Sequence, residues 1–90
     1  MTQVVVRLFG LGEGDASRKT LTRTVEPGTT IQMLWDSLRR EAGPSDKLRT
    51  VEREGLLVLV NGRPIRREAE WQMTVSEDDT VSYMPKAFGG

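Results

Sequence analysis

The chain contains neither cysteine nor histidine among its 90 residues. It therefore cannot form disulfides, use a thiolate or an imidazole in catalysis, or supply the usual ligands of zinc. An enzyme could still use carboxylates, lysine, serine or tyrosine, but the sequence shows no place where a nucleophile and a base converge. These absences argue against an enzyme that works alone.

An excess of charge of one sign is also missing, since 13 basic and 13 acidic residues cancel. Binding to phosphate backbones needs an excess of Lys and Arg, so we expect no nucleic-acid partner. No apolar run approaches the ~20 residues of a membrane span, so we expect no membrane partner. Residues 1–6 lack the basic region and apolar core of a signal peptide, which makes the cytoplasm the expected location.

Two short motifs suggest ligand sites that their context does not support. The polar segment Gly10–Arg18 contains Gly10-x-Gly12-x-Gly14, but it has neither the spacing of a dinucleotide fingerprint nor the Lys-Ser/Thr of a P-loop. We predict a flexible hairpin turn there. Glu77-Asp78-Asp79 has no further ligands nearby in the sequence, so we predict a solvated turn rather than a metal site. No bound cofactor or metal is expected.

Alternation of apolar and polar residues predicts three strands, Gln3–Phe9, Lys19–Glu26 and Thr80–Met84. Each of them has one face toward the core and one face away from it. The residues expected to face the core are Val4, Val6, Leu8, Leu21, Val25, Val81 and Tyr83. The residues expected on the opposite face are Gln3, Val5, Arg7, Phe9, Thr20, Thr22, Thr24, Ser82 and Met84.

A helix is predicted between the second and third strands. Thr29-x-x-Gln32 fits a capping box at its start, and Gly43-Pro44 stops it. Its apolar stripe, at amphipathic spacing, consists of Ile31, Leu34, Trp35 and Leu38. This spacing predicts that Trp35 is a core residue rather than a platform for a ligand.

The second half of the chain predicts a further pair of strands. Leu56–Val60 is a dense apolar strand, and Asn61-Gly62 is a strong signal for a two-residue hairpin. Pro64 cannot donate to a ladder, so the return strand beginning Arg63-Pro64-Ile65 is expected to be short or at an edge.

Other parts of this half are expected to complete the fold. Ser45–Glu54 is a charged connection with room for a short helical turn, and Trp71 and Met73 are expected to close the bottom of the core. The element order predicts an α+β fold in which one main helix covers a small mixed sheet of four to five strands. The first and last strands are expected to be neighbours in the middle of that sheet.

The chain is expected to consist of one domain, residues 1–85, and a flexible tail, residues 86–90, ending in Gly89-Gly90. Glycines have no Cβ, so they can enter a narrow channel and let the backbone of an enzyme approach closely. The reactive group would be the α-carboxylate of Gly90. Adenylation makes this carboxylate a good electrophile, and a partner must supply the site for ATP and Mg²⁺. The chain is then a carrier and a substrate, not a catalyst.

Three parts of the sequence resemble one family when they are taken together. They are Val58–Ile65, Glu77–Pro85 and the Gly89-Gly90 ending. In this order and in a chain of this length they are similar to the ThiS/MoaD family of ubiquitin-like sulfur carriers. The resemblance implies a β-grasp fold, activation by a ubiquitin-activating-type adenylating enzyme and a thiocarboxylate on Gly90. It also implies a sulfur acceptor such as a molybdopterin synthase large subunit, and some relatives are instead conjugated to lysines of proteins.

The resemblance assigns roles to the end of the chain. Gly90 is the acyl carrier, Gly89 is its slim neighbour, and Met84 and Pro85 lead into the tail. Lys86 stands where a second proline is common, and Phe88, after Ala87, stands where a small residue is common. Phe88 therefore either fills a matching pocket of a partner or indicates a less usual branch of the family.

Binding to a partner needs a surface besides the tail. We predict an apolar area on the exposed face of the sheet, formed by Met84, Phe9 and Val5 beside Arg7 and the tail residue Phe88. Two other functions remain open. One is a ubiquitin-like modifier conjugated through Gly90, and the other is a β-grasp interaction module without tail chemistry.

Overall fold

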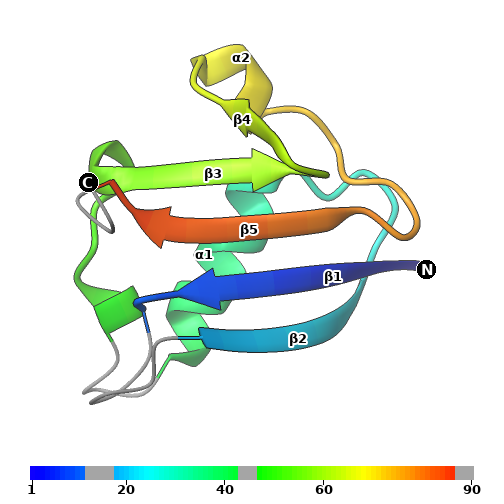
Figure 1. The fold of residues 1–90 in the computed structure, drawn as a ribbon. Coiled ribbons are helices and arrows are strands. Elements are labelled where there is room, and N and C mark those ends of the chain that lie inside the picture. The colour runs from blue at the N-terminus through cyan, green and yellow to red at the C-terminus, as the bar shows by residue number, and fades with distance from the viewer. Residues whose placement is uncertain (12–17, 43–46, 87–90) are drawn as a thin grey trace.

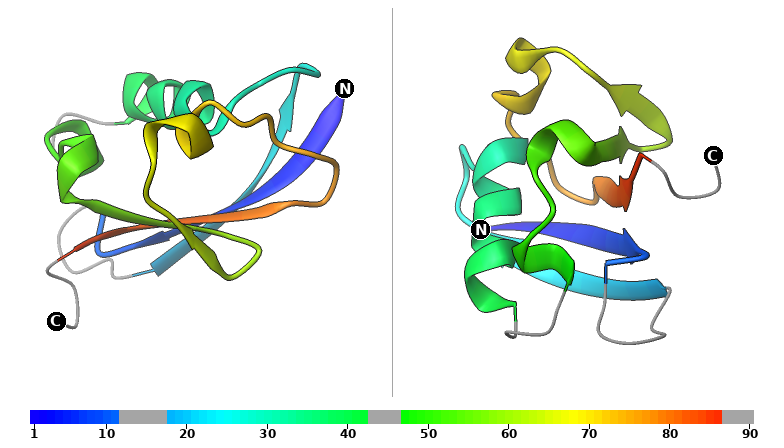
Figure 2. Two further views of the ribbon diagram at one scale, coloured as in Figure 1. Left: turned by 90° about the horizontal axis from the view of Figure 1, so that it is seen from above. Right: turned by 90° about the vertical axis from the view of Figure 1, so that its left-hand side faces the viewer.

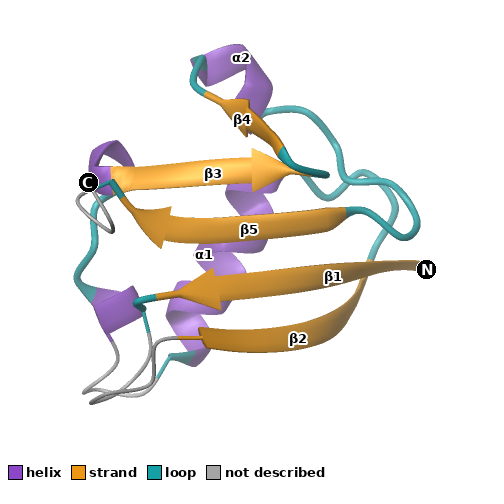
Figure 3. Ribbon diagram, in the orientation of Figure 1, coloured by secondary structure: helices purple, strands orange, loops and turns teal. Residues whose placement is uncertain are grey.

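The computed structural model describes residues 1–11, 18–42 and 47–86 (Figure 1). The elements, coloured by type in Figure 3, are β1 (Thr2–Phe9), β2 (Arg18–Val25), α1 (Ile31–Glu41), η1 (Lys47–Arg49), η2 (Arg53–Gly55), β3 (Leu56–Val60), β4 (Arg63–Ile65), α2 (Glu68–Trp71) and β5 (Thr80–Pro85). The predicted order of strands and main helix is confirmed. None of the helices in the described part is long and apolar enough to cross a membrane.

The sheet has the strand order β2-β1-β5-β3-β4. β1 and β5 pair in parallel at its centre, and the remaining pairs are antiparallel. The expected central position of the first and last strands is therefore confirmed. Figure 2 shows α1 packed across one face of the sheet, so the other face is left open.

The core lies between this sheet and α1. The four stripe residues Ile31, Leu34, Trp35 and Leu38 are all buried, as predicted. The Trp35 ring lies against the Tyr83 ring with centroids 4.8 Å apart, and the Tyr83 hydroxyl donates to the Ile31 carbonyl over 3.3 Å. Leu21 and Val25 of the edge strand β2 are partly buried against the same core.

The predicted capping box of α1 is wrong by one residue. Thr30 is the N-cap, and its hydroxyl accepts from the Met33 amide over 3.0 Å. The Thr29 hydroxyl instead donates to the Glu26 carbonyl over 2.7 Å. A bridge between Thr30 and Thr74 and a bond from the Val75 amide to the Thr29 carbonyl hold the entry segment, so the first helical turn begins later.

The predicted hairpin and short edge strand are confirmed. Asn61 and Gly62 have φ values of 52° and 84° and connect the paired residues Val60 and Arg63. β4 has three residues and lies at the sheet edge, as expected from Pro64.

Three residues outside the periodic segments, and Ser82 within β5, differ from expectation in burial. Met73 is 58% exposed and does not close the core, whereas Trp71 does. Leu11 and Leu48, both in predicted connections, are buried, and their backbones are joined by a 3.2 Å bond from the Leu48 amide to the Leu11 carbonyl. Ser82 faces away from α1 as predicted but is only 8% exposed, because it is small and lies in the central strand between longer side chains.

Two turn predictions fall largely on parts of the chain that are not described. Residues 12–17 of the Gly-rich turn and the Gly43-Pro44 stop signal lie outside the described residues. The flexible hairpin turn therefore stays a prediction. α1 ends at Glu41, two residues before Gly43, which agrees with the predicted end of the helix.

Candidate functional site

The open face of the sheet carries a row of apolar side chains from three neighbouring strands. Leu57 of β3 pairs with Met84 of β5, and the β1–β5 register, which pairs Leu8 with Tyr83, places Phe9 beside Met84. Residues directly opposite each other across a pair of strands lie ~4.5–5.5 Å apart at Cβ and share a face. All three side chains are half-buried. We call Phe9, Met84 and Leu57 the apolar row.

The four residues predicted to form a binding surface all lie on this face. Val5, Arg7 and Phe9 alternate along β1, and Met84 lies on the neighbouring strand β5. The Arg7 guanidinium lies over the Phe9 ring, 5.6 Å from its centroid, in a cation–π arrangement. The structure thus brings Phe9, Met84 and Arg7 close together. Val5 shares their face but lies beside Thr80, four residues from Phe9 along β1. The role of all four residues in binding stays a prediction.

Leu57 and Leu59 belong to the same face but were missed by the sequence reasoning. Leu59 pairs with Ser82, one row away from Leu57 and Met84. The run Leu56–Val60 is apolar at every position, so it has no alternation that distinguishes its two faces. The pairing with β5, whose alternation is clear, was the signal that could have found them.

The tail begins at the same end of the sheet as the apolar row. β5 ends at Pro85, which pairs with Leu56, and the Lys86 amide donates to the Gly55 carbonyl over 2.7 Å. The remaining tail residues Ala87, Phe88, Gly89 and Gly90 lie outside the described residues. What the structure fixes is the point from which the tail starts.

A cavity of about 350 Å³ lies beside Lys86 at the edge of β3. It forms where β4, which pairs only with Val58–Val60, leaves Leu56 and Leu57 without a neighbouring strand on that side. Its lining consists of Arg53, Glu54, Leu56, Leu57, Ile65, Arg66, Trp71 and Lys86. We call it the β3 edge cavity. It was not predicted, and it forms because β4 ends at Ile65, after which the Arg66 and Arg67 amides donate to the Glu70 carboxylate instead of to β3.

Arg53 forms one wall of the β3 edge cavity and is held on several sides. Its guanidinium lies over the Trp71 ring at 4.9 Å from the centroid, donates to the Gln32 side chain and pairs with the Glu68 carboxylate. The hydrogen bond from Arg53, followed by one from Gln72, lowers the pKa of Glu68 below its ordinary value. The charge of Arg53 is therefore balanced within the chain.

The acidic turn Glu77-Asp78-Asp79 is used by the fold. The Glu77 carboxylate accepts from the Gln3 amide over 2.9 Å, and the Asp79 carboxylate accepts from the Ser76 amide and the Asn61 side chain over 2.7 and 2.9 Å. Asp78 has a positive φ of 66°. Within residues 1–11, 18–42 and 47–86, no group of three or more acidic side chains could hold a metal ion.

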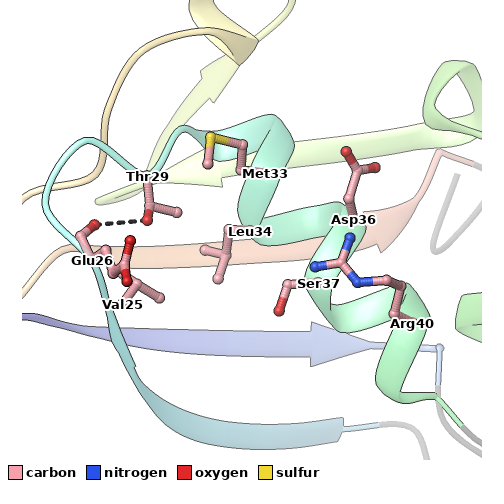
Figure 4. Close-up of a pocket in the computed structure, with 8 residues that line it drawn as sticks. All are labelled: Val25, Glu26, Thr29, Met33, Leu34, Asp36, Ser37 and Arg40. Carbon is pink, nitrogen blue, oxygen red and sulfur yellow. Dashed lines mark hydrogen bonds between the residues drawn. The ribbon is translucent and has the colours of Figure 1, made fainter.

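A second groove, of about 340 Å³, lies on the side of the sheet covered by α1 (Figure 4). It runs between the end of β2 and α1 and is lined by Val25, Glu26, Thr29, Met33, Leu34, Asp36, Ser37 and Arg40. Its charges have both signs, and its start at Val25 lies at the opposite end of the sheet from Met84. This groove is therefore separate from the apolar row and the tail.

No family model matches the chain, and no curated protein matches it. Solved structures do match. A solution structure of the Haloferax volcanii HVO 2177 protein is 23% identical with a TM-score of 0.72, covering 99% of this chain and 87% of that one. The Caldiarchaeum subterraneum ubiquitin is 14% identical with a TM-score of 0.53, covering 98% and 99%. Together with the sheet order and the single main helix, these likenesses show that the chain has the ubiquitin-like β-grasp fold.

Proposed function

We propose that the chain is a sulfur carrier. A partner of the ubiquitin-activating type binds ATP and Mg²⁺ and adenylates the carboxylate of Gly90, with release of pyrophosphate. Hydrosulfide then attacks the acyl carbon, AMP leaves, and Gly90 carries a thiocarboxylate. The sulfur passes to an acceptor enzyme, for which a molybdopterin synthase large subunit is the first candidate.

One observation supports this proposal more than any other. β5 pairs with β1 on one side and with β3 on the other. The residue that follows it, Lys86, lies beside the apolar row and four residues before Gly90. A partner can therefore bind the sheet face and the tail at the same time. The ThiS/MoaD resemblance of the sequence motifs and the β-grasp fold agree with this arrangement.

The proposal requires a chain that ends at Gly90, so the first measurement is the intact mass of the protein purified from its own source. The purified chain is then incubated with an adenylating enzyme of the same organism, ATP, Mg²⁺ and sulfide. We expect a mass increase equal to the exchange of one oxygen for sulfur, located at Gly90 by fragmentation. A variant extended by one residue after Gly90 is the control and should remain unmodified.

The absence of this mass change with each adenylating enzyme of that organism, when Gly90 is intact, would overturn the proposal. A reaction that also proceeds on the extended control would place the chemistry elsewhere in the chain.

Conjugation to proteins begins from the same adenylate, with a lysine amine in place of hydrosulfide. The likeness to a ubiquitin is one of fold, so it does not choose between the two fates. Trypsin cleaves after Lys86, so a conjugated lysine would carry the remnant Ala-Phe-Gly-Gly. Such peptides in cell extracts, lost when Gly90 is deleted, would establish a modifier function.

An interaction module without tail chemistry makes the opposite prediction. Deletion of Gly89 and Gly90 would then leave the cellular phenotype unchanged. A loss of function in a variant that remains folded would exclude this alternative.

A further inference from the structure

The two edges of the sheet differ in how they are protected against pairing with another strand (Figure 1). At one edge, β4 has three residues and contains Pro64, which cannot donate to a ladder. At the other edge, β2 has eight residues without proline or glycine, and it pairs with β1 at every position without a bulge. Short strands, prolines, bulges and charged side chains are the usual means of blocking an edge. Of these, β2 has only the charges.

The outer side of β2 carries backbone groups that a further strand can pair with. In an antiparallel ladder alternate residues exchange both of their hydrogen bonds, so every second residue of β2 directs its N–H and C=O away from β1. Within residues 1–11, 18–42 and 47–86, no segment pairs with that side of β2. A strand of another molecule can therefore extend the sheet there.

A second copy of β2 fits this edge, and the charges select its register. A closed dimer has a two-fold axis, and for two antiparallel edge strands this axis is perpendicular to the sheet. An axis through Leu21 would place Lys19 opposite Arg23 of the second copy, and an axis through Arg23 would place two arginines opposite each other. Like charges directly opposite each other are destabilising. An axis through Thr22 avoids both clashes, and larger shifts shorten the overlap.

The register about Thr22 also brings opposite charges together. It places Arg18 and Lys19 of one copy beside Glu26 of the other, twice in the dimer. These three residues are exposed, and within the described part of the chain none of them has an ion-pair partner. The remaining cation of the strand, Arg23, is already paired with Glu41 over 2.6 Å. Each copy therefore supplies unpaired positive charge at the start of β2 and an unpaired carboxylate just past its end.

The groove of Figure 4 lies at the place where this pairing would put Lys19 of the second copy. Val25 and Glu26 line the groove, and its other charged residues, Asp36 and Arg40, are of opposite sign, so Glu26 leaves it with an excess of negative charge. Lys19 stands opposite Val25 in this register and lies on the same side of the sheet, since it lines a small cavity together with residues of α1. Its stem can cover Val25 while its ammonium group reaches Glu26.

We propose that the chain forms a symmetric dimer through antiparallel pairing of two β2 edges, centred on Thr22. The two sheets become continuous, and both α1 helices lie on the same side of the joined sheet. β1 separates β2 from β5, so the pairing leaves the start of the tail and the apolar row uncovered. The dimer does not depend on the proposed function, and it presents two C-terminal ends from one sheet.

The test measures self-association of the full chain. Sedimentation equilibrium from ~1 μM to ~1 mM, a range that covers weak and moderate association, should show a monomer–dimer equilibrium. Thr22→Lys places two lysines directly opposite each other at the axis and should raise the dimer Kd about fivefold or more. Gln3→Lys is the matched control, because Gln3 is exposed on the same face of the neighbouring strand, and it should stay within about twofold of the parent chain.

A charge exchange tests the register. Lys19→Glu and Glu26→Lys should each raise Kd about fivefold, whereas the double variant should return it to within about twofold of the parent chain, because the exchanged pair is restored across the axis. Circular dichroism checks that every variant is folded. In the unmodified chain, amide exchange should slow with protein concentration at every second residue of β2.

Several outcomes would overturn the dimer. A chain that stays monomeric over the whole range would exclude a second copy as the occupant and leave the edge to a strand of a different protein. A dimer that is insensitive to Thr22→Lys, or that the charge exchange does not restore, would exclude this register. Removal of residues 87–90 should leave Kd unchanged, and loss of the dimer in that variant would place the contact at the tail instead.

Discussion

Tyr83 is the single tyrosine of the chain, and its ring lies in the core beneath α1. Burial disfavours the charged phenolate, and the negative charge of Asp36 acts in the same direction, so the pKa of Tyr83 is raised above its ordinary value. The unfolded chain ionises this group at pH ~10, whereas the folded chain retains the proton to higher pH. The folded state therefore loses stability relative to the unfolded state as the pH rises above ~10.

Because Tyr83 is the single tyrosine, its ionisation can be followed directly as the fold loses stability at high pH. We expect the tyrosinate absorbance to appear together with loss of circular dichroism, because ionisation requires exposure of Tyr83. Tyr83→Phe should cost about 1 kcal/mol at neutral pH through the lost hydrogen bond. It should also show a weaker decline in stability above pH ~10 than the parent chain. Tyrosinate absorbance in a chain that is still fully folded would contradict this prediction.

Gly62 is the residue at which the hairpin depends on a special backbone conformation. A Cβ at this position would meet no atom within 4 Å, so the cost of Gly62→Ala comes from φ of +84° alone. We expect a loss of about 1 kcal/mol in urea unfolding. Gly55→Ala is the control, since it is equally uncrowded and has no positive φ. A similar cost at both positions would contradict the backbone explanation.

At the scale of elements, two adjacent threonines at the start of α1 have different roles. Thr30→Ala removes the hydroxyl that accepts from the Met33 amide and should cost about 1 kcal/mol of unfolding free energy. Thr29→Ala removes only a donor to the Glu26 carbonyl and should cost less. Urea titration of both variants compares their losses of unfolding free energy. A larger loss for Thr29→Ala would contradict Thr30 as the N-cap and support the capping box expected from the sequence.

The elements could be predicted where periodicity was strong. Alternation in β1 and β5 and the helical stripe from Ile31 to Leu38 identified both layers of the fold and the core residues that these elements contribute. The exact cap was missed because Thr29 and Thr30 have equal intrinsic preference for it. The pairing of residues 29–31 with 73–75 decided between them, and that contact joins segments far apart in the sequence.

Contacts between segments far apart in the sequence also decided which connecting residues are buried and where the candidate site lies. Leu11 and Leu48 are buried because two connections pack against each other, and Met73 is exposed because the helical turn α2 already places Trp71 over the core. The β3 edge cavity arises from the short pairing of β4, which only the assembled sheet reveals. The Gly89-Gly90 tail was recognised from the sequence alone, whereas the apolar row and the β3 edge cavity beside its start were found only in the structure.

At the scale of the whole molecule, fold and tail should be separable. The buried core residues that the structure describes extend no further than Tyr83, and Lys86 is exposed. Removal of residues 87–90 should therefore change the free energy of unfolding by less than ~0.5 kcal/mol, as for surface changes. Adenylation should be abolished. Truncation after Ser82, which removes the buried Tyr83, is the contrasting variant and should prevent folding as judged by circular dichroism.

The parallel pairing of β1 and β5 has a mechanical consequence. The two strands run side by side in the same direction, so the start of β1 and the end of β5 lie at opposite ends of the sheet. A force that pulls Lys86 away from Met1 therefore acts along the ladder and loads its hydrogen bonds together, in shear, rather than breaking them one after another. A domain with this arrangement resists unfolding when another protein pulls on its C-terminal end.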